Sequence, residues 1–218
     1  MEKDSEDNSK KENKKAERRI EKELLWILAF ITFLVVLFFV ASAYFKSFNV
    51  IKYEGLSFTK EQLGEIPVYH YYYYFENKQG GLIKYNLYLR NDPSMNDVPV
   101  EGDVNLEHNR VFLSVDTLGL KECPQSILAV AGISAFLRDN QFNVLSGNPN
   151  FYDAGSENLD WVTCENKKGE NIVIILKEGD ETKINIDGRC HTISVANCEV
   201  LEAVEKYEVQ SIVDAKKS

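Results

Sequence analysis

The pattern of apolar and polar positions divides the chain into two parts. Residues 24–45 form an uninterrupted apolar run of 22 residues, fifteen of which are Leu, Ile, Phe or Val. A helix of this length spans roughly 33 Å, which is enough to cross a bilayer core of about 30 Å. A core helix of a soluble protein rarely stays apolar on every face for about six turns. The run therefore predicts a transmembrane helix that contacts the lipid bilayer.

Charge around this run predicts its orientation. Residues 1–23 are a charged segment with eight Lys or Arg and eight Asp or Glu, whereas only Lys46 and Lys52 follow the run closely. Because basic residues stay on the cytoplasmic side, we expect a cytoplasmic tail, 1–23, and an extracytoplasmic domain, 46–218. Ala41-Ser42-Ala43 resembles a signal-peptidase site, but the long leader and long apolar run favour an uncleaved signal anchor in the cell membrane.

Beyond the membrane run, short periods of apolar positions predict strands. Residues 68–75 read Val-Tyr-His-Tyr-Tyr-Tyr-Tyr-Phe, a composition that suits a strand. Residues 83–90 alternate, so the odd-numbered positions should face a core. Residues 172–176 are apolar without alternation, which is typical of a central strand. Asp187-Gly188 lies between two short extended segments and predicts a hairpin.

Two helices are expected in the outer domain. Pro124 opens an apolar segment that runs to about Arg138, between expected strands at 111–115 and 142–145. This strand–helix–strand order predicts a crossover connection, and we expect the helix to be buried on most sides. Asn197 is a suitable cap for a last helix.

Strands outnumber helices in this reading. Four segments separated by turn residues predict a meander: 161–165, 172–176, 183–186 and 190–195. We therefore predict an α+β fold, with a mostly antiparallel sheet covered by two helices.

The four cysteines, Cys123, Cys164, Cys190 and Cys198, all follow the membrane run. An even number in an extracytoplasmic domain favours two disulfides over free thiols. The sequence has no C-x-x-C pair of the kind that binds zinc, so a zinc site is not favoured. If residues 190–196 are extended, Cys190 and Cys198 lie roughly 26 Å apart, too far for a bond. Of the two remaining pairings we prefer Cys164–Cys190 with Cys123–Cys198, because Cys123 and Cys198 both adjoin helix starts. This pairing requires a strand order other than a simple meander.

The tyrosine-rich strand is the most unusual candidate surface. Tyr69, Tyr71 and Tyr73 share one face, which predicts core packing or, alternatively, a platform that binds a sugar or peptide. Cys123 before a helix could be a redox-active thiol, but a structural bridge is favoured. His191 adjoins Cys190, yet neighbours in a strand point to opposite faces, so no thiol–imidazole pair is expected.

Other titratable residues give no chemical motif. The remaining histidines, His70 and His108, are scattered, and no Walker loop, H-E-x-x-H or G-x-S-x-G is present. The acids of one long loop lack the spacing of an EF-hand and favour a solvated loop over calcium binding: Asp92, Asp97, Glu101, Asp103 and Glu107. We predict no catalytic residue, no metal site and no cofactor.

The charge of the outer domain bears on its partners. All of the net charge of −9 lies in residues 46–218, which argues against nucleic acid. We expect a membrane-anchored interaction or binding module with a protein partner in the cell envelope. The alternative is an extracytoplasmic enzyme of thiol-redox or hydrolytic type, which a concave pocket with convergent polar groups would favour.

Three stretches of the outer domain carry a resemblance to a known group: 64–70, 85–93 and 196–201. They are similar to uncharacterised single-pass membrane proteins of small-genome archaea. The resemblance implies the anchored topology and carries no activity over to any residue.

Overall fold

The computed structural model describes residues 24–42, 44, 49–77, 79–107, 110–167, 169 and 171–217. The chain divides between Asn49 and Val50 into two compact units. In the first, Leu24–Ser42 form one helix of 19 residues that is long and apolar enough to cross a membrane. The predicted tail, 1–23, lies outside the described residues, as does Ala43 of the Ala41-Ser42-Ala43 stretch.

The second unit begins with an antiparallel four-stranded sheet, in the order β1-β2-β3-β4. The strands are β1 (Val50–Tyr53), β2 (Leu56–Leu63), β3 (Ile66–Glu76) and β4 (Leu82–Leu89). The alternation predicted for β4 is confirmed: Leu87 and Leu89 are buried, whereas Asn86 and Tyr88 are exposed.

A second sheet has seven strands, in the order β5-β10-β11-β9-β6-β7-β8. They are β5 (Val100–Glu101), β6 (Arg110–Val115), β7 (Asn143–Asn148), β8 (Asp160–Trp161), β9 (Ile172–Glu178), β10 (Lys183–Asp187) and β11 (Cys190–Val195). Of its strand pairs only β10–β11 is antiparallel, and the others are parallel. The α+β class holds, but the prediction of one mostly antiparallel sheet is wrong, because it missed these long-range parallel pairs.

The predicted meander of 161–195 is also wrong. β11 lies between β9 and β10, and most of 161–165 is not strand: α4 begins at Cys164 and ends at Lys167. The hairpin at Asp187-Gly188 is confirmed, because Asp187 pairs with Cys190 across the turn. The apolar run 172–176 is central and wholly buried, as its lack of alternation predicts.

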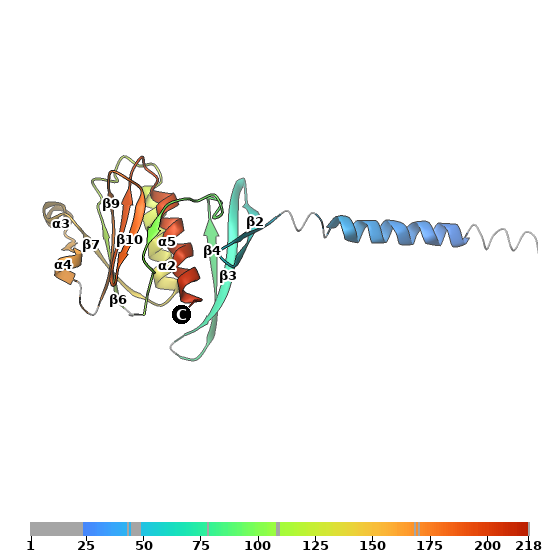
Figure 1. Ribbon diagram of the computed structural model, residues 1–218, viewed down its shortest axis with the longest axis horizontal. Helices are drawn as coiled ribbons and strands as arrows, with labels where there is room; N and C mark the ends of the chain where they lie inside the picture. Colours follow the sequence, from blue (N-terminus) through green and yellow to red (C-terminus); the bar gives the residue numbers. More distant parts are fainter. Residues whose placement is uncertain are drawn as a thin grey trace, which may run out of the picture. The chain divides into compact units, whose positions relative to one another are not determined.

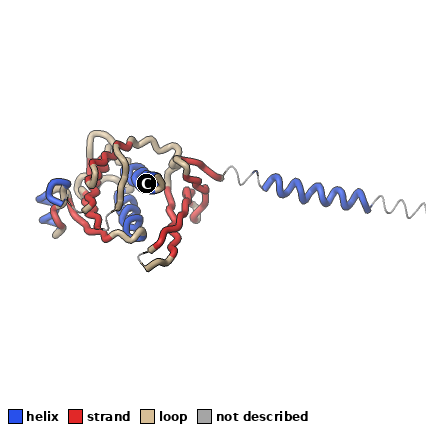
Figure 2. The backbone as a smooth tube through the Cα atoms, turned by 60° about the horizontal axis from the view of Figure 1, so that its bottom comes forward, coloured by secondary structure: helices blue, strands red, loops and turns tan. Residues whose placement is uncertain are grey.

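The helices α2 (Ser126–Asp139) and α5 (Val200–Ala215) form a layer between the two sheets (Figure 1). One continuous core joins both sheets to this layer, with Phe58 and Leu89 from the smaller sheet and Ile174 and Ile193 from the larger. Figure 2 shows the same order from another side, with the two long helices of the domain between the strands of the two sheets. The short helix α3 (Phe151–Glu157) packs beside β7 and β8. The two long helices, α2 and α5, thus lie inside the domain and do not cover one sheet from outside.

Details of the two long helices differ from the predictions. Ile127 and Leu128 of α2 are exposed, so this helix is not buried on most sides. Asn197 does not cap α5: the cap residue is Glu199, and Asn197 has a left-handed φ of 51°. In contrast, α5 is buried around almost its whole circumference, because a sheet lies on either side of it.

Two disulfides cross-link the domain, and one of them joins the helices of the layer. Cys123–Cys198 joins the residues that precede α2 and α5, with Cα atoms 5.1 Å apart, so both helices start at the same end of the domain. Cys164–Cys190 ties α4 to β11, with Cα atoms 5.6 Å apart. This is the pairing that the sequence argument preferred, and the strand order is indeed not a simple meander.

Candidate functional site

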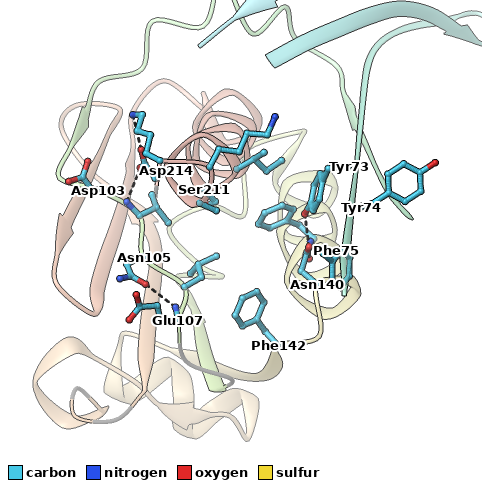
Figure 3. Close-up of a pocket in the computed structure, with 17 residues that line it drawn as sticks. Tyr73, Tyr74, Phe75, Asp103, Asn105, Glu107, Asn140, Phe142, Ser211 and Asp214 are labelled. Carbon is cyan, nitrogen blue, oxygen red and sulfur yellow. Dashed lines mark hydrogen bonds and ion pairs between the residues drawn. The ribbon is translucent and has the colours of Figure 1, made fainter. Parts of the chain in front are cut away.

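In the second unit, a cavity of about 700 Å³ lies where α2 and α5 end (Figure 3). Its walls come from the second half of β3, from the loop that follows β5, and from the C-terminal turns of both helices. The lining residues are Tyr73, Tyr74, Phe75, Asp103, Val104, Asn105, Leu106, Glu107, Phe136, Asn140, Phe142, Ser211, Ile212, Asp214, Ala215, Lys216 and Lys217. Cavities of this size are typical of sites for small molecules.

The apolar wall follows from the way in which α2 ends. Gln141 adopts a left-handed φ of 67°, its N–H donates to the carbonyl of Arg138, and the Phe142 N–H donates to that of Leu137. This is a Schellman motif, which turns the chain sharply and brings the following apolar side chain back to the helix end. Phe142 therefore joins Phe136 in one aromatic wall of the cavity.

Tyr73 and Asn140 place a polar group in this wall. The Tyr73 hydroxyl donates to the Asn140 Oδ1 at 2.5 Å, and the Asn140 Nδ2 donates to the Phe136 carbonyl at 2.8 Å. Burial raises the pKa of Tyr73, although its hydrogen bond to Asn140 acts the other way. The phenol is therefore neutral, and its proton is already engaged in a hydrogen bond within the protein.

Asp214 holds the opposite wall in place. Its carboxylate accepts hydrogen bonds from the Val104 N–H at 3.0 Å, the Gln210 amide at 2.9 Å and the Lys217 ammonium at 3.1 Å. Burial acts to raise the pKa of Asp214, but these hydrogen bonds outweigh it and lower the pKa below the usual value. The carboxylate thus fastens the loop that contains Val104 to the end of α5.

Charges of both signs surround the mouth. Asp103 and Glu107 are exposed on the loop, and the Lys216 ammonium lies 5.2 Å from the ring centre of Tyr71. Lys217 pairs with Asp214. Since the cations are matched by nearby acids or an aromatic face, the cavity presents an apolar interior with no strong excess of either charge.

The tyrosines predicted as a platform face the helical layer. Tyr71 is buried, Tyr69 and Tyr73 are half-buried, and all three pack against the core. Only Tyr73 of the three lines the cavity. Tyr74, on the other face of β3, points away from it in Figure 3. The face of β3 that is open to solvent carries Tyr72 and Tyr74 instead.

Cys190 and His191 point to opposite sides of β11, as predicted. Cys190 bonds to Cys164, whereas His191 faces α5. The His191 Nε2 lies 3.2 Å from the Gly188 carbonyl and must donate to it, so the Nδ1 accepts from the Tyr207 hydroxyl at 2.6 Å. Burial lowers the pKa of His191 to about 4, which keeps the ring neutral.

The other predicted candidates do not converge. His70 donates to Glu61 at 2.9 Å and stacks on Tyr88, while His108 lies outside the described residues. Of the loop acids, Asp103 and Glu107 reach the cavity, and Asp92, Asp97 and Glu101 lie elsewhere. Within the part of the chain that the structure describes, no group of three or more His, Cys, Asp or Glu could hold a metal ion.

Sequence reasoning missed most of the cavity. Asn140 and Phe142 belong to a helix end whose left-handed residue is Gln141, not the glycine that usually marks such an end. The role of Asp214 in holding the loop has no sequence signal either, because Val104, which donates to it, lies 110 residues earlier.

Comparisons of the chain with protein-family models, curated proteins and solved structures give no match. The resemblance to single-pass membrane proteins of small-genome archaea therefore stays a prediction. A function has to be argued from the fold and the cavity.

Proposed function

We propose that this protein is a membrane-anchored, extracytoplasmic binding domain whose large cavity takes a mainly apolar, uncharged group such as an aromatic ring. The observation that carries the proposal is the cavity of about 700 Å³ at the open end of the helical layer. Phe75, Phe136 and Phe142 supply aromatic wall, and Tyr73 with Asn140 supplies a polar edge. Such a combination is typical of sites that bind a small molecule.

The polar groups of the cavity favour binding over catalysis. Tyr73, Asn140 and Asp214 each engage in hydrogen bonds within the protein. Catalysis by a side chain requires a nucleophile or a base that can reach a substrate. All four cysteines are in disulfides, so a thiol-redox enzyme would have to open one of them.

Two observations support the anchored, extracytoplasmic setting. The helix Leu24–Ser42 has the length and composition of a membrane span. Disulfides such as Cys123–Cys198 persist in oxidising compartments outside the cytoplasm. The proposed orientation, with the tail inside and the domain outside, rests on the sequence: more basic residues stand before the helix than just after it.

The test uses the full-length protein in lipid nanodiscs and indole as the probe. Indole has an aromatic body and one N–H donor. We expect the methyl NMR signal of Ile212, which lines the cavity, to shift saturably with indole, while that of Ile193 in the central core stays unchanged. The variant Ala215→Trp should fill the mouth and abolish the shift.

The matched control is Ala131→Trp, the same substitution at an exposed position of α2 that does not line the cavity. This variant should bind indole as the wild type does. An Ile212 signal that never saturates, or one that shifts equally in both tryptophan variants, would contradict the proposed site.

A further inference from the structure

A second cleft lies at the opposite end of the helical layer and is separate from the cavity. Its volume is about 250 Å³, and it opens between the smaller sheet and the N-terminal halves of α2 and α5. Its lining residues are Leu63, Ile66, Val68, Tyr88, Arg90, Leu128, Gly132, Leu201, Val204, Glu205 and Glu208. We call it the acidic cleft.

Glu208 is the unexplained group in the acidic cleft. Its side chain is on α5, is only 5% exposed, and makes no hydrogen bond or ion pair with any residue that the structure describes. Gly132 of α2 faces it: a Cβ built on this glycine would lie 3.6 Å from the Glu208 Oε1. The glycine therefore leaves the approach to the carboxyl group open.

Glu205 lies in the same cleft but has a structural role. Its oxygens accept hydrogen bonds from the Arg90 N–H at 2.5 Å and from the Asn91 N–H and Nδ2 at 3.0 and 2.9 Å. These contacts fasten the end of β4 to α5. The two carboxyl groups thus differ: Glu205 is fully engaged, and Glu208 has no partner among the described residues.

The surroundings of Glu208 make an ionised carboxylate costly. Burial, together with the negative charge of the nearby Glu205, raises its pKa to about 8. Burial also raises the pKa of Glu205, to about 7, against the hydrogen bonds from Arg90 and Asn91. The other titratable groups on this side are Glu202 on α5, Tyr73 on β3, and Tyr85, Tyr88 and Arg90 on or just after β4.

The mouth of the acidic cleft is apolar. Leu63, Ile66, Tyr88 and Leu128 are large side chains that line it, and each is exposed to solvent, Leu63 by 54%. Exposed apolar side chains gathered around a pocket are typical of a surface that binds another protein. An aromatic ring such as Tyr88 also attracts a cation over its face.

We propose that the acidic cleft receives a lysine or arginine side chain of a partner protein, with the apolar stem along Leu63, Leu128 and Tyr88 and the cation at Glu208. Charge complementarity carries the assignment. The Glu208 oxygens have no partner among the described residues, and since no fully buried side-chain oxygen there lacks a hydrogen bond, they open into the cleft, where a cation on an apolar stem can pair with them. When the cation enters, the Glu208 proton leaves to solvent, so the carboxylate and the cation form a neutral pair. Arg90 lies at the mouth and must turn aside for the incoming side chain.

The test is isothermal titration calorimetry with the full-length protein in phosphatidylcholine nanodiscs, whose lipids carry no net charge; empty nanodiscs give the background heat. The probes are N-acetyl-lysine methylamide, N-acetyl-arginine methylamide and the neutral N-acetyl-norleucine methylamide. We expect at least one cationic probe to bind and to release a proton, seen by comparing buffers of different ionisation enthalpy. Its affinity should rise about tenfold per pH unit between pH 6 and 7, where Glu208 still holds most of its proton.

Two variants test the role of the carboxyl group. Glu208→Gln should lower the affinity for the cationic probe at least tenfold and abolish proton release. Glu202→Gln, on the same helix, should bind the probe like the wild type. Gly132→Ala keeps Glu208 but narrows its approach, and it should weaken binding severalfold without loss of thermal stability. Binding of norleucine as tight as that of lysine, unchanged binding in the Glu208 variant, or no binding of either cation at 20 mM would overturn the proposal.

Discussion

The substitution Glu208→Gln should stabilise the domain of residues 50–218 at alkaline pH and change little at acidic pH. Glu208 is buried in the helical layer, and burial with the nearby Glu205 raises its pKa from 4.5 to about 8. Below pH 4.5 Glu208 is protonated in both the folded and the unfolded state, so its titration costs no stability there. As the pH rises towards 8, the unfolded chain releases the proton while the folded chain retains it, and stability is lost.

The magnitude follows from the shift. Each pH unit in this window costs roughly 1.4 kcal/mol, so an isolated group moved from 4.5 to about 8 would cost about 5 kcal/mol by pH 8. Because Glu205 titrates in the same cleft, the two groups share the protonation change, and a single substitution removes only part of it. We therefore expect Glu208→Gln to raise the free energy of unfolding by about 2–4 kcal/mol at pH 8.

The assay is urea unfolding of the full-length protein in detergent micelles, at several values between pH 5 and pH 8.5. The chain has two tryptophans, so a Trp26→Phe background leaves Trp161 as the reporter of the outer domain. Glu202→Gln, also on α5, is the control and should track the wild type within about 0.5 kcal/mol. A difference between wild type and Glu208→Gln that is the same at pH 5 and pH 8.5 would refute the reasoning.

Three further predictions concern the rest of the outer domain. Gly102→Ala should cost about 2–4 kcal/mol in urea unfolding, because φ is 93° and the new Cβ would lie 2.5 Å from the Ile186 carbonyl oxygen. Burial lowers the pKa of His191 to about 4, so the stability that comes from its neutral ring is present above pH 6.5 and is lost as the pH falls towards 4. His191→Gln should therefore reduce the difference in the free energy of unfolding between pH 7 and pH 4.5 by up to roughly 3 kcal/mol. Replacing Cys123 and Cys198 by serine should cost about 4 kcal/mol in the same assay, because the bridge closes a loop across 75 positions.

Two of these predictions, for Gly102 and for the Cys123–Cys198 bridge, have an internal comparison. Gly155→Ala, on the exposed face of α3 with nothing within 4 Å of the new Cβ, should be neutral or stabilising by up to about 1 kcal/mol. A cost at Gly155 equal to that at Gly102 would show that neither the φ nor the close carbonyl matters. The bridge Cys164–Cys190 spans only 26 positions and should contribute slightly less than Cys123–Cys198.

Local patterns in the sequence predicted local structure well. The alternation of β4 gave its buried face, because side chains in a strand alternate whatever lies beyond it. The Asp187-Gly188 pair gave the β10–β11 hairpin, and the unbroken apolar run 172–176 gave a central strand. The disulfide argument also worked from local geometry, since the extended segment from Cys190 keeps Cys198 out of reach.

Long-range pairing could not be read from the same patterns. β6 pairs in parallel with β9, which begins more than fifty residues later, and no short-range period records that choice. The burial of α5 could not be predicted for a similar reason. Its sequence mixes acidic with apolar residues, which is typical of a helix with one solvent-exposed face. Instead a second sheet lies over it and buries Glu205, Lys206, Glu208 and Asp214.

The sandwiched helical layer also explains why the domain has an opening at each end. α2 has 14 residues and α5 has 16, so these helices are about 21 and 24 Å long, whereas the 11 residues of β3 extend over roughly 36 Å. A strand that runs along shorter helices must overhang them. The start of β3, at Ile66 and Val68, lines the acidic cleft, and its end, at Tyr73 and Phe75, lines the large cavity. Lengthening α5 by one turn after Ala215 should therefore reduce indole binding at the large cavity and leave the acidic cleft unchanged, which would separate the two sites in one protein.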